Sequence, residues 1–342
     1  MRERKRGTKL LPAGKLPLEL LRRLLNKYAR KDPSVIVGPS IGIDSAVIDF
    51  HGKYLVAKTD PITFVADDIG AYAIFVNSND IAVMGAVPRW VLATILLPEG
   101  KATAQMAQSI FAQINKACKQ LDITLCGGHT EITPDIDRPI VVGHMLGEIQ
   151  DHKLITGGGA QAGDDILLTK GIAIEAVSII AREKRDELVK NFNPKFITRC
   201  KNFLRRPGLS ILKEALIAVQ NGRVHAMHDP TEGGLSTGLH ELAIASKCGI
   251  LAEKSAIPIL PESKALCDHY GLDIMGAIAS GALIISINPE DTVKVIGKLK
   301  EAGIKACRIG KITDRKKGVK IMDSGKIQPL KPFKTDEITK IF

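Results

Sequence analysis

Segments with the apolar spacing of helices alternate with segments that have the character of strands along most of this chain of 342 residues. The helical spacing is clearest over residues 102–120, where Met106, Ile110 and Ile114 recur about every four positions. A chain that alternates in this way folds into mixed domains of the α/β or α+β class. We expect further helices over residues 16–28, 69–84, 174–182, 211–220 and 234–246, and strands over residues 41–50, 54–58, 90–97, 123–126, 140–149, 166–169, 282–287 and 306–309.

Three consecutive glycines, Gly157, Gly158 and Gly159, interrupt this alternation near the middle of the chain. Glycine runs favour loops, because glycine loses more backbone freedom in a regular element than any other residue. At about 150 residues per domain, a chain of this length predicts two domains. We therefore predict one domain over residues 1–156 and a second over residues 157–342.

The cysteines and the apolar segments favour a cytoplasmic protein. None of the six cysteines forms a CxxC pair, and none is spaced with histidine as in a zinc site. Unpaired cysteines are typical of a reducing compartment. The longest apolar stretch, residues 274–287, contains glycine and serine and is shorter than the ~20 residues of a membrane-spanning helix. We therefore expect no membrane segment, and the N-terminus lacks the continuous apolar core of a secretory signal.

The net charge of +11 is concentrated at the two ends of the chain. Residues 1–31 hold eleven Lys or Arg and two Glu, and residues 311–342 hold nine Lys or Arg and four acids. Such ends either bind nucleic acid or another acidic partner, or are solvated tails. No nucleic-acid-binding motif accompanies the charge, so we favour solvated tails and do not expect a nucleic-acid partner.

Six short segments rich in small residues carry acidic or amide side chains. Taken singly, an acid on such a turn is usually a turn former or a helix cap, and Asp67 and Asp68 have the place of caps before the helix predicted at residue 69. Six of them in one chain favour a shared site instead. The segments are 42–47 (with Asp44), 58–60 (Lys58 and Asp60), 67–70, 77–80 (Asn77 and Asp80), 127–131 (Gly127, Gly128, His129 and Thr130) and 229–234 (Asp229).

The chemistry of these segments indicates a magnesium–nucleotide site. Mg²⁺ is held by a few carboxylates and completes its shell with water and phosphate oxygens. Asn77 and Asp80 are three residues apart on a predicted helix and so share one face. Gly127 and Gly128, in a turn predicted to follow a short buried strand, leave backbone N–H groups accessible to an anion. The P-loop and GxSxG signatures are absent from the sequence.

Three further side chains near these segments carry reactive groups. His129 is equally suited to phosphate contact or acid–base catalysis and to a structural hydrogen bond. For Cys126 we favour a small buried apolar residue over a nucleophile. For His228, directly before Asp229, we favour a structural role over a catalytic one.

The order of the motifs G-I-D-S-A-V, K-T-D, N-S-N-D-I-A-V-M-G-A, G-G-H-T and D-P-T-E-G-G-L resembles the PurM-like, or AIR synthase-related, superfamily. The resemblance runs from about residue 38 to residue 312, and its third and fifth motifs are most similar to those of the hydrogenase-maturation proteins HypE. It implies an α+β fold of two domains. The N-terminal domain would be ferredoxin-like, with a sheet that pairs with a second subunit in a barrel, and the C-terminal domain would be an α/β layer. The implied protein is a homodimer that binds ATP between its domains.

The resemblance also implies roles, motif by motif. It implies ATP and Mg²⁺ as cofactors, and an ATP-dependent activity that phosphorylates or dehydrates a carbonyl or amide-type substrate, small or carrier-bound. The implied metal ligands are Asp44, Asp60, Asp80 and Asp229. The implied ATP-binding residues are Asp44, Lys58, Asp60, Asn77, Asp80, Gly127, Gly128 and Thr130, and the implied catalytic residues are Asp60, Asp80, His129 and Asp229.

One departure from the family pattern leaves a second hypothesis open. HypE proteins end in a flexible Pro-Arg-Ile-Cys tail whose cysteine carries the group that is dehydrated, whereas residues 336–342 of this sequence contain no cysteine. The alternative is a non-catalytic nucleotide-binding or scaffold protein that acts as a regulatory or maturation-complex partner.

Overall fold

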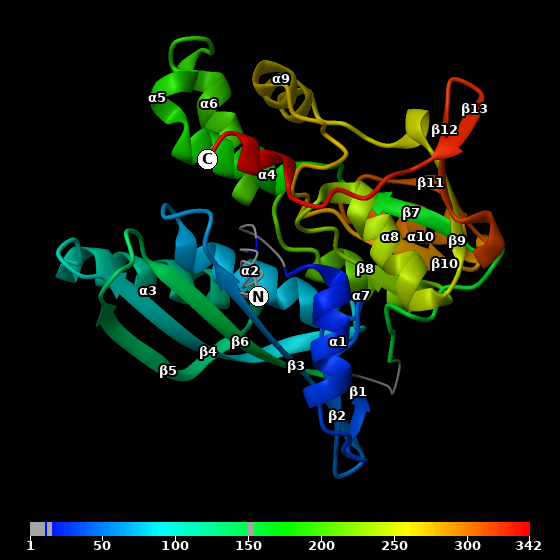
Figure 1. Ribbon diagram of the computed structural model, residues 1–342, viewed down its shortest axis with the longest axis horizontal. Helices are drawn as coiled ribbons and strands as arrows, with labels where there is room; N and C mark the ends of the chain where they lie inside the picture. The colour runs from blue at the N-terminus through cyan, green and yellow to red at the C-terminus, as the bar shows by residue number, and fades with distance from the viewer. Residues whose placement is uncertain (1–10, 12–15, 150–153) are drawn as a thin grey trace, which may run out of the picture.

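The computed structural model describes residues 11, 16–149 and 154–342, so the basic segment 1–10 lies outside the described residues (Figure 1). Within the described residues the strands form two sheets, one of six strands and one of seven. The first sheet is built from residues before Gly157 and the second from residues after it. The architecture is mixed α+β, which confirms the predicted fold class, while the limits of the two domains stay a prediction.

The N-terminal half contains one long helix that is buried and one that is amphipathic, both packed with its sheet. Its elements are α1 (Leu18–Tyr28), β1 (Val35–Val37), β2 (Ala46–Phe50), β3 (Lys53–Ile62), α2 (Ile69–Ala82), β4 (Ala86–Pro98), α3 (Ala104–Leu121), β5 (Thr124–Thr133) and β6 (Ile140–Ile149). The strand order is β1-β2-β3-β6-β4-β5. All neighbouring strands are antiparallel except β4 and β5, which are parallel and connected by α3. β5 is therefore an edge strand.

The C-terminal half carries the second sheet, with strand order β13-β12-β9-β11-β7-β10-β8. The strands at the β8 end of this sheet, β7, β10 and β8, are almost entirely buried. The elements are β7 (Asp165–Thr169), α4 (Ile174–Glu183), α5 (Arg185–Leu188), α6 (Pro194–Lys201), η1 (Asn202–Leu204), α7 (Leu212–Asn221), β8 (Val224–His228), α8 (Gly234–Ser246), β9 (Gly249–Glu253), η2 (Lys254–Ala256), α9 (Pro261–Tyr270), β10 (Ile284–Ile287), η3 (Pro289–Asp291), α10 (Thr292–Glu301), β11 (Ala306–Thr313), η4 (Arg315–Lys317), β12 (Val319–Asp323), β13 (Lys326–Pro329) and η5 (Glu337–Lys340).

Helix α2 is buried over its whole length, including the polar residues at its C-terminal end. Buried polar side chains need partners inside the protein or a bound ligand. Asn79 finds its partners in the second domain: its Nδ2 donates to the carbonyl of Leu209 and its Oδ1 accepts from the N–H of Ile211, both at 2.9 Å. The polar end of α2 thus ties the two halves of the chain together.

The carboxylate of Asp68 does not cap α2, contrary to the expectation from sequence. Asp68 is the residue before the helix, but its carboxylate accepts hydrogen bonds from Arg182 at 2.7 Å and from Arg205 at 3.3 Å. Charge-assisted bonds to two cations are stronger than a bond to one backbone N–H. Asp67 also faces this group, with its carboxylate 3.7 Å from Arg182. These acids therefore join the domains instead of capping the helix.

Most of the predicted segments are present, and the largest error concerns residues 123–126. The helices predicted near residues 69, 102, 174, 211 and 234 all occur. The short buried strand and the turn expected at residues 123–131 are instead the long strand β5, which is mostly exposed and runs on through Gly127, Gly128 and His129. Several elements, most of them short, were not predicted: β1, β8, β9, β12, β13, α5, α6, α9 and α10.

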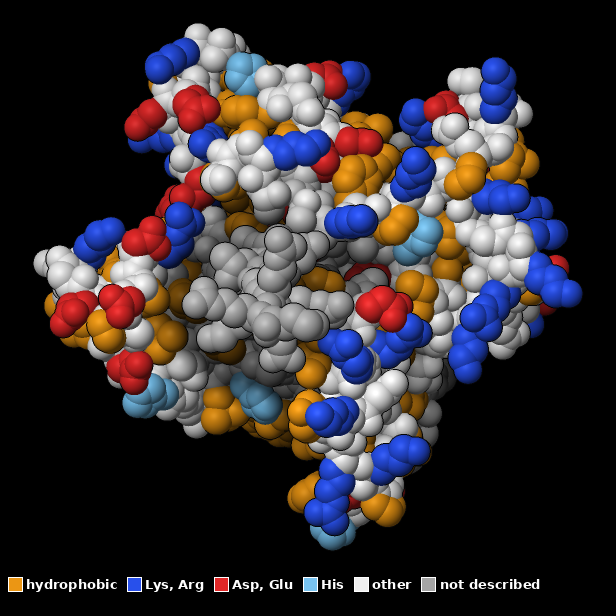
Figure 2. Space-filling view, viewed as in Figure 1, with side chains coloured by type: hydrophobic (Ala, Val, Ile, Leu, Met, Phe, Trp, Pro, Cys, Tyr) orange, Lys and Arg blue, Asp and Glu red, His pale blue; other side chains and the backbone are white. Residues whose placement is uncertain are grey.

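Positive side chains gather over α1 and over the lobe that carries β12 and β13 (Figure 2). In that lobe Arg315, Lys316, Lys317 and Lys326 are exposed. The charge of the C-terminal segment is therefore displayed on the surface. In the part of the chain that the structure describes, no helix has both the length and the apolar character needed to cross a bilayer.

Candidate functional site

Three aspartates from distant parts of the sequence meet where the two halves of the chain join. Asp44 precedes β2, Asp80 lies on α2, and Asp229 directly follows β8. One carboxylate oxygen of each lies within 4.8 Å of the other two. Asp80 and Asp229 are buried, and the side chain of Asp44 is 16% exposed. We call these three residues the aspartate cluster.

Lys58 and Asp60 lie beside the aspartate cluster. They are two residues apart on β3 and so project from the same face of the sheet. Lys58 Nζ is 3.2 Å from Asp80 Oδ2 and 4.0 Å from Asp60 Oδ2. Burial opposes the charge of Lys58, but the carboxylates of Asp80, Asp60 and Asp44 raise its pKa above the ordinary value. Lys58 therefore stays a cation inside the site.

Two acids of the cluster, Asp80 and Asp229, are difficult to ionise as long as no further cation is present. Burial raises the pKa of Asp80 to about 7, and the nearby Lys58 offsets this only in part. Burial, together with the charges of Asp80 and Asp44, raises the pKa of Asp229 well above its usual range. Among the described residues, nothing donates a hydrogen bond to either carboxylate oxygen of Asp229. Such unpartnered buried acceptors are costly unless a ligand satisfies them.

His228 bridges two carboxylates from opposite sides of the junction. Its Nδ1 is 3.0 Å from Asp44 Oδ2 and its Nε2 is 3.0 Å from Glu241 Oε2 on α8. An ionised carboxylate only accepts hydrogen bonds, so both ring nitrogens must donate. Burial disfavours the charged ring, but Asp44 and Glu241 together raise the pKa of His228 well above 6.5. The expected structural role of His228 agrees with this arrangement, in which the imidazolium orients Asp44.

Asn77 holds the helix α2 against β3, and Ser45, directly before β2, holds its C-terminal end. Asn77 Nδ2 donates to the carbonyl of Ala73 at 2.9 Å and to that of Asp60 at 3.2 Å. Ser45 Oγ donates to the carbonyl of Asp80 at 2.7 Å. Asn77 therefore positions the backbone of Asp60, and its Oδ1 has no hydrogen-bond partner among the described residues.

The residues of this site fit a hard divalent cation. Carboxylate oxygens are the ligands that Mg²⁺ prefers, and one oxygen from each of the three aspartates lies close enough to the others for the group to surround a single cation. The unpartnered oxygens of Asp229 would gain a partner, and the positive charge would favour ionisation of both Asp80 and Asp229. Asp60 lies at the more exposed edge, next to Lys58, where a ligand of the same cation can enter.

The glycine motif of β5 is not brought to the aspartate cluster within one chain. The register aligns Asp60 with Gly143, Ala93 and then Gly128 across β3, β6, β4 and β5. Three strand spacings of about 4.8 Å place Gly128 roughly 14 Å from Asp60. Gly128 has φ +147°, and a Cβ there would lie 2.0 Å from the carbonyl oxygen of Ala93. The close approach of β5 to β4 at this position therefore requires glycine.

The neighbours of Gly128 are exposed at the sheet edge. The ring of His129 is 3.0 Å from the carboxylate of Glu131, and Thr130 is exposed. Cys126 is also exposed, which contradicts the expected burial, because β5 has no strand on its outer side among the described residues. The order of the motifs predicted one site for residues 127–130 and the aspartates, but two strands of the sheet lie between β5 and β3.

Glu175 is a buried acid near the site that sequence analysis did not identify. It lies in the first turn of α4 and is 5% exposed. Burial raises its pKa to about 8, with Asp336, Glu232 and Asp60 adding to the shift and Ser280 opposing it. Its Oε2 has no hydrogen-bond partner among the described residues. The helical pattern of α4 gave no signal for it, because a glutamate in a first helical turn is ordinary.

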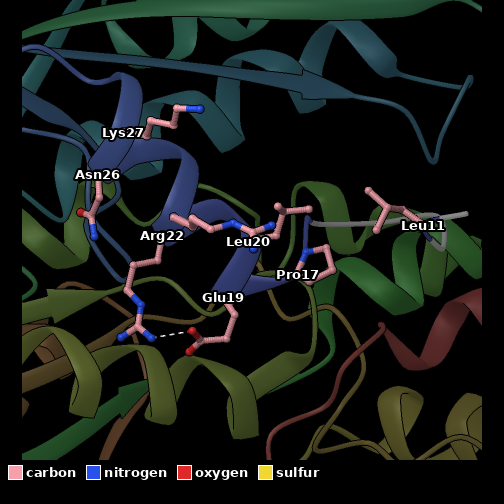
Figure 3. Close-up of a pocket in the computed structure, with 8 residues that line it drawn as sticks. Leu11, Pro17, Glu19, Leu20, Arg22, Asn26 and Lys27 are labelled. Carbon is pink, nitrogen blue, oxygen red and sulfur yellow. Dashed lines mark hydrogen bonds and ion pairs between the residues drawn. The ribbon is translucent and has the colours of Figure 1, made fainter. Parts of the chain in front are cut away.

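A separate hollow of about 750 Å³ lies along α1 (Figure 3). In Figure 3, Glu19 and Arg22 form an ion pair on one side of the helix, and Leu20 and Pro17 lie near Leu11. None of the residues that line it belongs to the aspartate cluster: Leu11, Pro17, Glu19, Leu20, Arg22, Arg23, Asn26 and Lys27. This hollow is thus a feature of the surface of α1 and does not extend the candidate site.

Two family descriptions match the chain in succession. The AIR synthase related protein N-terminal domain matches residues 42–149, and the C-terminal domain of the same family matches residues 161–323. The chain is 28% identical over 317 residues to a putative hydrogenase expression/formation protein of Methanocaldococcus jannaschii, covering 90% of each protein. It is 29% identical over 272 residues to the carbamoyl dehydratase HypE of Cupriavidus necator, covering 77% of this chain and 74% of that one.

Solved structures share the fold over almost the whole chain. HypE in complex with ATP has a TM-score of 0.71 and 23% identity, covering 94% of this chain and 98% of that one. The HypE–HypF complex has a TM-score of 0.75 and 19% identity, covering 92% of this chain and 99% of the matched chain. The two successive matches and the shared two-domain fold lead to one conclusion: this chain belongs to the AIR synthase-related, or PurM-like, family.

Proposed function

We propose that the protein is an ATP-dependent enzyme that transfers the γ-phosphoryl group to the oxygen of a carbonyl or amide-type substrate. The observation that carries the proposal is the aspartate cluster: three carboxylates within 4.8 Å, two of them buried, beside the cation Lys58. Phosphoryl transfer requires little more than positioning and neutralisation of phosphate charge. Carboxylates that hold Mg²⁺, together with a lysine, supply these two requirements.

The residues of the site have different tasks in this proposal. Asp44, Asp80 and Asp229 would hold Mg²⁺, which supplies charge neutralisation when bound. Asp60, as the most exposed acid, would contact the ion at the side where the triphosphate enters. Lys58 would neutralise phosphate oxygens, and His228 would keep Asp44 in place. The bond from the γ-phosphorus to the bridging oxygen breaks, the bond to the substrate oxygen forms, and ADP leaves.

The names of the relatives support the reaction class. The HypE relative is a carbamoyl dehydratase, and a selenide, water dikinase of Methanococcus maripaludis is 26% identical over 324 residues. The second name is that of a phosphoryl-transfer enzyme, and a HypE has been solved in complex with ATP, which supports an ATP-dependent reaction whose substrate differs between relatives. For an amide substrate, elimination of the transferred phosphate together with the loss of two N–H protons would leave a nitrile. The proposal covers a small as well as a carrier-bound substrate, and it includes a maturation-type protein partner.

In a homodimer, the glycine motif of β5 could contribute to the nucleotide site of the second subunit. β5 is ten residues long and largely exposed at the sheet edge. The sheet face away from α2 carries half-exposed apolar side chains, which favour a partner surface: Leu92, Leu96, Val142 and Leu146. A long uncovered edge strand also favours pairing. In such a dimer Gly127, Gly128 and Thr130 of one subunit would face the nucleotide of the other, which would give them the ATP contact that the resemblance implies, and His129 would lie beside them in its implied catalytic role.

The test is calorimetric titration of the protein with ATP and Mg²⁺, comparing wild type with Asp229→Asn. The variant removes a ligand, so we expect affinity for Mg²⁺–ATP to fall at least about tenfold. It also removes a buried acid without partners, so the unliganded protein should be no less stable in thermal unfolding. The exposed Asp186→Asn on α5 is the matched control and should bind as wild type does.

Turnover separates the enzyme from the alternative of a non-catalytic scaffold. Wild type should release ADP in the presence of Mg²⁺ and an acceptor from a panel of amides and carboxylates. Equal nucleotide binding by wild type and Asp229→Asn would refute the assigned site. Tight binding without ADP release on any acceptor would favour the scaffold.

A further inference from the structure

A second cavity lies at the junction of the two halves of the chain and shares no residue with the aspartate cluster. Its volume is about 890 Å³. Phe75 of α2 and Leu121 at the end of α3 form its N-terminal side, and the segment 204–216 forms most of its opposite side. The remaining apolar lining comes from Leu204, Leu209, Leu212, Leu216, Leu260 and Ile304.

The charged groups at the mouth of this cavity are mostly positive. Arg206, Lys213 and Lys305 are exposed there, and Lys213 Nζ uses one donor on the carbonyl of Ala302 at 3.1 Å. Among the described residues Arg206 forms no ion pair. Asp122 is an acid at the mouth, and its side chain is 99% exposed, so water screens it.

Deeper in the cavity, charge is balanced. Lys170 Nζ is 2.7 Å from Glu214 Oε1, and both side chains are buried. The same ammonium donates to the carbonyls of Gly208 and Ser210, each at 2.9 Å. All three donors of Lys170 are thereby used, so this lysine fixes the wall and does not serve as a free ligand contact. The net positive charge of the cavity therefore resides at its mouth.

The wall of the cavity is connected directly to the helix that carries Asp80. Asn79 donates to Leu209 and accepts from Ile211, so the segment held by Lys170 is also held by α2. Asn79 and Asp80 are consecutive residues. A ligand that shifts the wall must therefore shift or strain the end of α2 where the aspartate cluster lies.

From these observations we propose that the cavity is an effector site for a small organic anion, with an apolar body against the leucines and an acidic headgroup on Arg206 and Lys305. Binding at this site is independent of the function proposed above, whereas its effect on Mg²⁺–ATP rests on that function. A cavity with an apolar floor and a few polar groups at its mouth is typical of small-molecule sites. The cationic mouth selects against neutral and positive ligands of the same shape.

The first experiment measures binding of the fluorescent anion anilinonaphthalene sulfonate to the full chain. We compare wild type, the pair Arg206→Glu with Lys305→Glu, and the control pair Lys316→Glu with Lys326→Glu, which changes net charge equally outside the cavity. The cavity pair should bind about tenfold more weakly, as expected for the loss of two partly exposed charge contacts. The control pair should match wild type. Equal affinity for all three proteins would refute the site.

Two further measurements separate the headgroup from the cavity itself. The neutral analogue phenylnaphthylamine should bind wild type and the cavity pair alike, and a parallel loss of its binding would refute the role of the two cations. If the cavity pair does not fold, the milder pair Arg206→Gln with Lys305→Gln should show a smaller loss for the sulfonate, and no loss there would count against the proposal.

The coupling is tested by titrating Mg²⁺–ATP with and without saturating sulfonate probe. Linkage requires that any change in one affinity appears equally in the other. We expect a shift of about fivefold in wild type, in the range usual for coupled sites, and none in the cavity pair. An unchanged Mg²⁺–ATP affinity with intact probe binding would refute the effector role. Absent Mg²⁺–ATP binding with intact probe binding would instead refute the proposed function and leave the anion site standing.

Discussion

At the scale of single residues, His228 shows how a buried charge is made tolerable. The ring lies between Asp44 and Glu241, and its side chain is 3% exposed. Removing one member of a buried charge network leaves the others without compensation, at a cost of roughly 3–5 kcal/mol. We expect His228→Ala to lower the free energy of unfolding by about that amount. Chemical denaturation at neutral pH measures it, with the half-buried His240→Ala as the comparison.

The contribution of His228 to stability should also depend on pH. Its pKa is raised in the folded state, so the stabilisation is fully present below the unfolded value of about 6.5 and declines as pH rises toward the folded value. The difference in free energy of unfolding between wild type and His228→Ala should therefore be largest below about pH 6 and shrink in alkaline buffer. A difference that grows with pH would contradict the double-donor arrangement.

The protonation of Asp80 should make Mg²⁺ binding depend on pH as well. Its pKa is about 7 without a metal, so a large fraction of the carboxyls is protonated at neutral pH. A cation binds the ionised form, so Mg²⁺ binding should release protons and strengthen as pH rises from about 6 to 8. Calorimetry in two buffers of different ionisation enthalpy counts the protons. Asp80→Asn should abolish both the binding and the release, and pH-independent binding in wild type would contradict the assignment.

At the scale of elements, the close approach of α2 to β6 depends on glycines of β6, of which Gly143 faces the amide of Asn77 and Gly147 faces Ile81. A Cβ at Gly143 would lie 2.4 Å from Asn77 Nδ2, so an alanine there must push the amide away from β3. We expect Gly143→Ala to destabilise the protein by about 1–3 kcal/mol and to weaken Mg²⁺–ATP binding, because α2 carries Asp80. Thermal unfolding and calorimetry measure the two effects.

Gly297 in α10 provides the matched control. A Cβ there meets nothing within 4 Å, and the residue is helical. Gly297→Ala should leave ligand binding unchanged and stabilise the protein by about 0.5–1 kcal/mol, because alanine has the higher helix propensity. If both alanine variants behaved alike, crowding at Asn77 would not be the cause.

At the scale of the whole molecule, the proposed homodimer would form through the exposed edge of β5. Ile132 on β5 is 64% exposed. If the proposed homodimer forms through this edge, Ile132→Lys should shift the protein to monomer in light scattering, because a lysine on an edge strand opposes pairing. Val293→Lys on α10, where the native side chain is 82% exposed, should leave the oligomeric state unchanged. A monomeric wild type would refute the dimer.

The sequence by itself determined the class of the fold, most long helices and the identity of the acids. Periodic apolar spacing is a local property, so α3, α4 and α7 could be predicted from their own residues, and α2 and α8 show in the sequence as long, mostly apolar runs. The motif order also pointed to Asp44, Asp80 and Asp229, because a phosphate-binding cation needs carboxylates. Short elements such as β1 and α5 carry too few residues for a period to be visible.

Only the tertiary structure decided which of the motif residues meet. Strand pairing depends on contacts between residues far apart in sequence, so the three strand spacings between Asp60 and Gly128 could not be foreseen. The same holds for His228, whose two carboxylate partners come from residues 44 and 241. The burial that raises the pKa values of Asp80 and Glu175 is likewise a property of the packed molecule, because desolvation depends on every surrounding segment.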